Sequence, residues 1–190
     1  MDDRRQEFGR YRVDLDSYVR RTRSGPCFVC RVVEGDPDFF HHVVYEDDAT
    51  IAFLSKYPTL YGYTLVAPKE HREQVTGDFT EGEYLDLQRT VHRVSEAVRE
   101  EVSAERMYLF SLGSQQGNSH VHWCIAPLPS GVPYEEQQFA TLMMETAGVL
   151  NVPEAEKVSL AARIRRRIER QLETVTPGRS TETHGLEEER

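Results

Sequence analysis

The 190-residue sequence has only three cysteines, a single tryptophan, and no long apolar run. Three cysteines are too few for the disulfide framework of a small secreted scaffold. The first 25 residues lack the apolar stretch that a signal peptide requires, so we expect a cytoplasmic protein. No window approaches the roughly 18 apolar residues of a membrane-spanning helix, and the mean hydropathy is −0.59. We therefore expect no membrane partner.

The sequence also lacks an excess of positive charge. It contains 23 Lys and Arg against 32 Asp and Glu, which gives a net charge of −9. No global basic field is available to bind duplex nucleic acid, so any phosphate ligand must be bound by local groups. The length suits one domain with terminal extensions. A hydrophobic content of 38% indicates that polar extensions dilute an ordinary core.

Hydrophobic spacing predicts a mixed α and β domain between two helical extensions. Residues 1–23 carry an apolar stripe at spacings of three and four, which predicts an N-terminal helix. From residue 24 onward, short apolar runs alternate with turn signals, as expected of strands. The predicted strands, which we place in one sheet, are 42–45, 50–54, 64–67, 107–112 and 119–126.

The most strongly predicted helix follows Thr80, with Glu83 three residues later in the arrangement of a capping box. Its apolar stripe, expected to cover one face of the sheet, is Tyr84, Leu87, Val91, Val94 and Val98. Further helices are predicted over 135–146 and 154–173. Residues 174–190 have too few apolar groups to offset their ordering entropy, so we expect a disordered tail. The predicted units are 1–23, a domain over 24–150, a helix over 151–173 and the tail.

The segment SHVHWCIAP carries the main chemical signal. On a strand, alternate side chains share a face, so His120, His122 and Cys124 project together and the residues between them enter the core. Two imidazoles could bind a metal, or one could be an unprotonated nucleophile. The alternative is a strand face that carries histidines without a special role.

A loop rich in glycine and amides, LGSQQGNS, precedes this strand at 112–119. Glycine allows backbone N–H groups to approach a phosphate, and Gln, Asn and Ser add neutral donors. Gly and Asn also occur in ordinary hairpin turns, so the loop alone does not establish a phosphate site.

Cys27 and Cys30 have the two-residue gap that lets two thiolates bind one tetrahedral zinc ion. Two more ligands are needed, and spacing does not select among the candidates, which are His41, His42, His71 and His120. A redox dithiol and a pair of inert buried thiols are the alternatives.

Taken in order, these motifs resemble the histidine triad (HIT) superfamily. They are the CxxC pair, a strand ending in AFL, the segment GYTLVAPKEH, a long helix, and HVHWC before a proline. The resemblance implies an antiparallel sheet flanked by helices and a homodimer. It also implies cleavage at the α-phosphate of a nucleotide through a covalent nucleotidyl-histidine, with His122 as nucleophile. In zinc-bearing members the matching ligands of a structural zinc are Cys27, Cys30, His71 and His120.

The sequence departs from the family pattern at two positions. Cys124 stands where HIT hydrolases have a third histidine and related transferases have glutamine. Ser55 stands where an aspartate usually contacts the ribose, and Lys56 lies two residues before a proline, in a Lys-x-Pro segment similar to that of diadenosine tetraphosphate phosphorylases. We therefore predict a HIT-type hydrolase or nucleotidyltransferase acting on a phosphoramidate or a dinucleoside polyphosphate. The alternatives are a phosphorylase-like transferase and a non-catalytic nucleotide-binding module.

Apart from the four zinc ligands, the predicted site residues have two roles. Those with a catalytic role are His122, Cys124 and Ser119. Those expected to bind substrate are Phe53, Ser55, Lys56, Gln115, Gln116 and Asn118.

Overall fold

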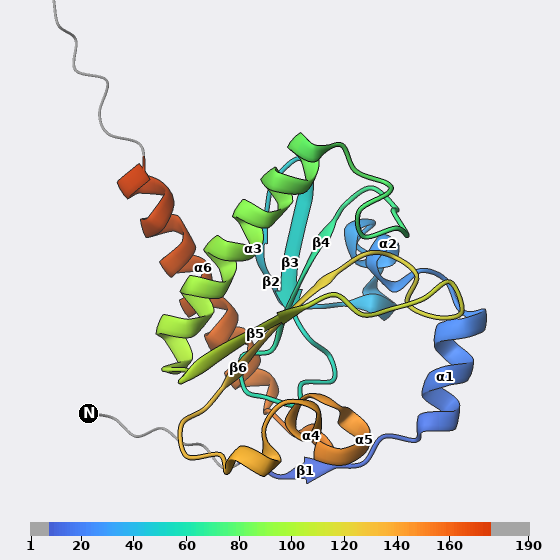
Figure 1. Ribbon diagram of the computed structural model, residues 1–190, viewed down its shortest axis with the longest axis vertical. Helices are drawn as coiled ribbons and strands as arrows, with labels where there is room; N and C mark the ends of the chain where they lie inside the picture. The colour runs from blue at the N-terminus through green and yellow to red at the C-terminus, as the bar shows by residue number, and fades with distance from the viewer. Residues whose placement is uncertain (1–7, 176–190) are drawn as a thin grey trace, which may run out of the picture.

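The computed structural model describes residues 8–175 (Figure 1). Its strands are β1 (Arg10–Tyr11), β2 (Val43–Glu46), β3 (Thr50–Leu54), β4 (Thr64–Pro68), β5 (Arg106–Phe110), β6 (Trp123–Leu128) and β7 (Val149–Leu150). Its α-helices are α1 (Leu15–Ser24), α2 (Phe28–Val33), α3 (Glu81–Val102), α4 (Phe139–Leu142), α5 (Met144–Ala147) and α6 (Glu154–Val175). Two 3₁₀ turns are η1 (Pro37–Phe39) and η2 (Tyr134–Glu136).

Five of the strands form one antiparallel sheet in the order β2-β3-β4-β6-β5. This confirms the predicted α+β fold with a five-stranded antiparallel sheet. Strands β3 and β4 are buried along their whole length, as expected for central strands covered on both faces. The register pairs Leu65 with Cys124, which fixes the thiol near the middle of the sheet.

The predicted core helix is α3, and its capping box is present. Thr80 N–H donates to Glu83 Oε2 at 2.7 Å, and Glu83 N–H donates to Thr80 Oγ1 at 3.3 Å. The predicted stripe of α3 packs with Trp123 into one hydrophobic core. Figure 1 shows α3 and α6 together on one side of the sheet and α1 and α2 on the other.

Helix α6 is part of this core. Its buried residues are Leu160, Ala161, Ile164 and Ile168, and they contact the core built by α3 and the sheet. Two arginines of α6 also pair with Glu101 of α3, at 2.5 Å from Arg163 Nε and 2.6 Å from Arg167 Nε.

The structure corrects the predicted N-terminal helix. It begins at Leu15 rather than near the start of the chain, because Asp14 caps it by accepting from Ser17 N–H at 3.1 Å. Before the cap, Arg10 and Tyr11 form strand β1, which pairs with β7.

The predicted helix over 135–146 is also wrong in part. The region is divided into η2, α4 and α5, and the backbone at Met143 is extended between the two short helices. Helix α6 runs two residues beyond its predicted end at 173. The rest of the predicted tail, residues 176–190, lies outside the described residues, as do residues 1–7.

Strand β6 begins at Trp123 rather than at the predicted residue 119. The neighbouring strand β4 ends at Pro68, which has no N–H to continue the ladder. Val121 N–H instead donates to the Arg72 carbonyl at 2.7 Å. Within residues 8–175 no helix has the length and apolar character needed to cross a membrane.

Candidate active site and metal centre

The side chains of the segment that carries the histidines alternate as predicted. Val121, Trp123 and Ile125 enter the main hydrophobic core. His120, His122 and Cys124 line a cavity of about 940 Å³ on the other side. Although regular strand geometry starts only at Trp123, the extended backbone before it preserves the alternation.

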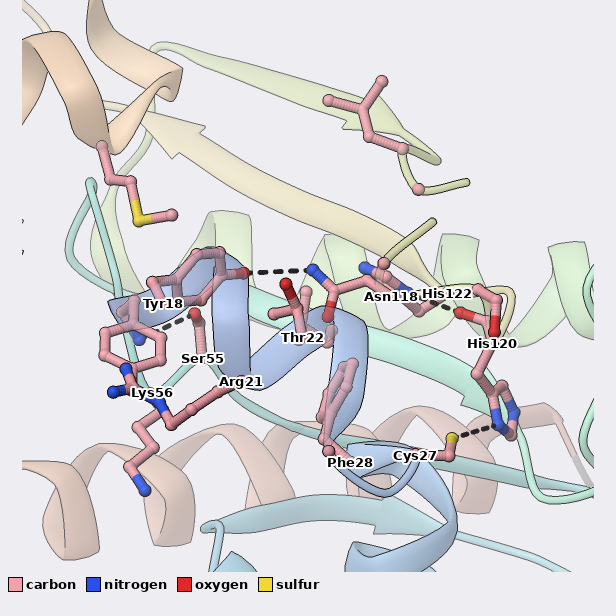
Figure 2. A pocket seen from close by; sticks show the side chains of 18 of the residues that line it. Tyr18, Arg21, Thr22, Cys27, Phe28, Ser55, Lys56, Asn118, His120 and His122 are labelled. Carbon is pink, nitrogen blue, oxygen red and sulfur yellow. Dashed lines mark hydrogen bonds between the residues drawn. The ribbon is translucent and has the colours of Figure 1, made fainter. Parts of the chain in front are cut away.

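His122 is held in one tautomer by the backbone. Its Nδ1 lies 2.8 Å from the His120 carbonyl oxygen, which can only accept, so Nδ1 carries the proton (Figure 2). Nε2 of the neutral ring is then unprotonated. Burial lowers the pKa of His122, which favours this neutral form. The Phe28 ring contacts the imidazole edge to face, with ring centroids 5.6 Å apart, and this contact fixes its orientation.

Cys27, Cys30, His71 and His120 form a cluster that could hold a metal ion, with all four ligand atoms within 4.8 Å of one another. His120 Nδ1 lies 3.3 Å from Cys27 Sγ and 3.6 Å from Cys30 Sγ, and His71 Nδ1 lies 3.4 Å from Cys30 Sγ. Bond lengths of about 2.3 Å to sulfur and 2.05 Å to nitrogen imply a sulfur to nitrogen separation of about 3.6 Å in a tetrahedral zinc site. The observed separations therefore fit zinc.

The far sides of both imidazoles support the same conclusion. His120 Nε2 donates to the Pro68 carbonyl at 2.9 Å, and His71 Nε2 donates to Glu73 Oε1 at 3.2 Å. Each Nδ1 is then free of a proton in the neutral ring and directs a lone pair at the thiols. Burial lowers the pKa of His120 to about 4, so this imidazole is neutral at pH 7.

The other two candidate histidines lie outside the cluster. His41 Nδ1 donates to the Phe39 carbonyl at 2.7 Å. His42 Nε2 lies 2.7 Å from Glu154 Oε1 at the start of α6. The structure thus brings together the ligand set that the family resemblance implied, which spacing alone could not select.

The glycine-rich loop forms another part of the cavity wall. Its predicted binding residues Gln115, Gln116, Asn118 and Ser119 all line the cavity. Gly113 adopts φ +149°, and a Cβ at this position would lie 2.5 Å from the Asn118 carbonyl oxygen. Only glycine fits this close approach of two backbone segments.

Phe53 does not line the cavity, contrary to the prediction that it contacts the nucleoside. Its side chain has 0% exposure because Phe28 and His41 pack over it, with centroids 6.4 and 4.9 Å away. Phe28 and His41, which cover Phe53, do line the cavity. The apolar character of the strand was predictable from the sequence, but the layer that covers it was not.

Ser55 and Lys56, both predicted to bind substrate, line the cavity. Ser55 Oγ accepts from Tyr57 N–H at 3.2 Å, so it stabilises the turn after β3 as well as facing the cavity. Cys124 is buried beside the Tyr63 hydroxyl, and burial raises the pKa of its thiol to about 11. Cys124 is therefore a neutral thiol next to His122, unable to supply positive charge.

No sequence pattern indicates that residues outside the predicted site segments reach this cavity. Tyr18 and Arg21 of α1 line it, as do Met143 and Met144 around the start of α5. Tyr18 belongs to the stripe that predicted the N-terminal helix, but periodicity does not reveal what a helix packs against.

The family profile and the relatives found by comparison with known proteins indicate the same family. The HIT domain profile matches residues 38–128. An uncharacterized HIT-like protein of Saccharolobus solfataricus is 33% identical over 110 residues, which cover 56% of this chain and 77% of that protein. The hit protein of Bacillus subtilis is 31% identical over 104 residues, covering 54% of this chain and 70% of that protein.

Solved structures share the fold. A hypothetical histidine triad nucleotide-binding protein from Sulfolobus tokodaii has a TM-score of 0.61 and 28% identity, covering 76% of this chain and 93% of its own. A zinc-bound histidine triad family protein from Mycobacterium smegmatis has a TM-score of 0.61 and 21% identity, and the match covers 79% of this chain and 97% of that chain. From the motifs, the fold and these relatives, we conclude that the chain belongs to the histidine triad (HIT) family.

Proposed function

We propose that this HIT protein is a nucleotide hydrolase or nucleotidyltransferase that acts at the α-phosphate of a nucleotide conjugate, with His122 as nucleophile. The observation that carries the proposal is the fixed tautomer of His122 on the cavity wall, since Nδ1 donates to the His120 carbonyl and Nε2 keeps its lone pair. The nucleotide-binding relative from Sulfolobus tokodaii supports the substrate class.

In this mechanism Nε2 of His122 bonds to the α-phosphorus while the bond from phosphorus to the leaving group breaks. The leaving group departs with the electron pair and takes a proton. Water or another acceptor then displaces the nucleotidyl group from His122 and restores the free imidazole. The hydrogen bond to the His120 carbonyl stabilises the ring as positive charge develops. The loop containing Gln115, Asn118 and Ser119 offers neutral donors to the phosphoryl oxygens.

Cys27, Cys30, His71 and His120 would hold a structural zinc ion. All four coordination positions would then be filled by protein, so the ion would crosslink the start of α2, the segment after β4 and the segment before β6. We assign it no part in the reaction.

A phosphorylase-like transfer and a non-catalytic nucleotide-binding module are the other candidates. Lys56 on the cavity wall favours an anionic acceptor such as inorganic phosphate. The neutral Cys124 thiol favours weak catalysis, because a thiol is a poor hydrogen-bond donor to a phosphoryl oxygen.

The wider assignments are proposals of the same kind. We assign residues 24–150 to the HIT domain and the terminal segments to extensions that fold onto it, as β1 and α6 do in the described part. A homodimer and a cytoplasmic location are expected from the family resemblance and from the three free cysteines.

The test is a panel of adenosine and guanosine phosphoramidates and dinucleoside polyphosphates, with and without inorganic phosphate. It compares the natural protein with His122→Ala and with His92→Ala, which changes an exposed histidine on α3. We expect turnover and an intact-mass nucleotidyl adduct in the natural protein and the control, and neither with His122→Ala. Turnover that survives His122→Ala would refute the assignment of His122 as the nucleophile. Turnover that depends on inorganic phosphate would identify a phosphorylase.

A further inference from the structure

Helix α1, which lies outside the matched residues 38–128, packs directly on the glycine-rich loop. Asn118 Nδ2 donates to the Tyr18 hydroxyl at 3.1 Å (Figure 2). A Cβ on Gly117 would lie 3.3 Å from Thr22 Oγ1, so helix and loop are in close contact. The Tyr18 ring also meets Tyr57 edge to face at 5.6 Å. Helix α1 is therefore a wall of the site, joined to both the loop and the turn after β3.

This wall changes the charge of the cavity. The charged side chains of Lys, Arg, Asp and Glu that line it are Arg20, Arg21, Arg23, Lys56, Asp38 and Glu145. Four cations thus face two carboxylates in a chain whose net charge is −9. The local excess of positive charge is opposite to that of the whole molecule, which indicates an anionic ligand.

Two of these cations, Arg21 of α1 and Lys56 of the turn after β3, come to the cavity wall from different segments of the chain. Arg20 already donates to Ser17 Oγ at 2.7 Å. Within residues 8–175, Arg21 and Lys56 are exposed and are in none of the observed ion pairs, so neither is neutralised by a described carboxylate. In Figure 2 both are drawn at the end of the cavity away from His120 and His122.

We propose that Arg21 and Lys56 form a second anion subsite, which binds phosphate groups beyond the one that His122 attacks. The ligand class is a nucleotide with two or more phosphates in a row, such as a dinucleoside polyphosphate, rather than a nucleoside phosphoramidate. The proposal rests on the proposed function for its position in the reaction. The subsite itself depends only on the cavity and its charges.

Binding measurements test the subsite without requiring turnover. Dissociation constants of AMP, ADP and ATP are measured by calorimetry for the full chain, Arg21→Gln, Lys56→Gln and the double variant. The matched control is Arg12→Gln, an exposed arginine of the same N-terminal segment that does not line the cavity. Thermal unfolding of each variant confirms that it is folded.

We expect ATP to bind at least about tenfold more tightly than AMP at low salt, because each additional phosphate group brings negative charge that the exposed cations of the subsite attract. The double variant should lose about tenfold in ATP affinity and less than about twofold in AMP affinity, while Arg12→Gln changes neither. The difference between ATP and AMP should shrink as salt screens the subsite. Equal affinities of AMP and ATP, or an unchanged ratio in the double variant, would overturn the proposal.

An activity measurement separates this proposal from the proposed function. The double variant should lose a larger factor of kcat/KM for diadenosine tetraphosphate than for adenosine phosphoramidate. Equal losses for both substrates would contradict a distal subsite. If the natural protein turns over neither substrate, the proposed reaction fails, and the binding series still decides whether the subsite exists.

Discussion

Zinc should stabilise this protein by an amount that can be calculated from binding linkage. Three sulfur to nitrogen separations in the cluster, 3.3, 3.4 and 3.6 Å, are close to those of a tetrahedral zinc site, so binding of zinc requires little rearrangement there. A ligand that binds only the folded state adds RT ln(1 + [L]/Kd) to the free energy of unfolding. We predict an increase of about 1.4 kcal/mol for each tenfold rise in free zinc above Kd, reaching about 4.1 kcal/mol at 1,000 times Kd.

The assay is urea unfolding in zinc buffers, followed by the fluorescence of Trp123, the single tryptophan, which lies in the main core. Cys30→Ser removes a ligand and should abolish the dependence on zinc. Cys124→Ser makes the same change outside the cluster and should retain the slope, whatever its own effect on stability. A zinc-independent free energy of unfolding, or equal slopes for the two variants, would refute the metal site.

Three further outcomes test the fold and the site. Ile164→Ala, at a fully buried position of α6, should lower the free energy of unfolding by about 2 to 5 kcal/mol. The control Val158→Ala, at 54% exposure on the same helix, should change it by less than about 0.5 kcal/mol. A separate unfolding transition for α6 would contradict a core shared by α6, α3 and the sheet. Cys124→His should raise kcat on any accepted substrate, because the cavity beside it has room for the ring; turnover that appears only in this variant would favour a non-catalytic natural protein. Ser55→Asp should tighten binding of ribonucleotides and leave 2′,3′-dideoxynucleotides unchanged in an equilibrium titration, and equal effects on both would place the ribose elsewhere.

The elements that could be predicted from the sequence are those specified by local signals. Thr80 and Glu83 determine the start of α3, and alternation places His120, His122 and Cys124 on one face. The start of β6 could not be predicted, because it depends on Pro68 in the neighbouring strand. The same is true of α1, whose N-terminal boundary is set by the Asp14 cap that a longer apolar stripe obscured.

The site was predictable in composition more than in arrangement. The CxxC spacing indicates a metal but does not select the other two ligands; the family resemblance implies His71 and His120, and the fold brings these to Cys27 and Cys30 while His41 and His42 lie elsewhere. Neither spacing nor resemblance indicates which buried residue lies behind another. Phe53, which the resemblance assigns to substrate binding, lies in the layer beneath Phe28 and His41.

The metal cluster and the proposed phosphate subsite are connected through the backbone. Helix α1 ends at Ser24, and Gly25 N–H donates to the Arg21 carbonyl at 2.8 Å, where a Cβ would lie 2.5 Å from that oxygen. This tight end leaves only Gly25 and Pro26 between α1 and the ligand Cys27. The ligand His120 is likewise two residues from His122. A metal ion bound by Cys27 and His120 would therefore hold both His122 and the end of α1 that carries Arg21 in fixed positions. It would influence substrate binding by positioning these residues, without taking part in the reaction.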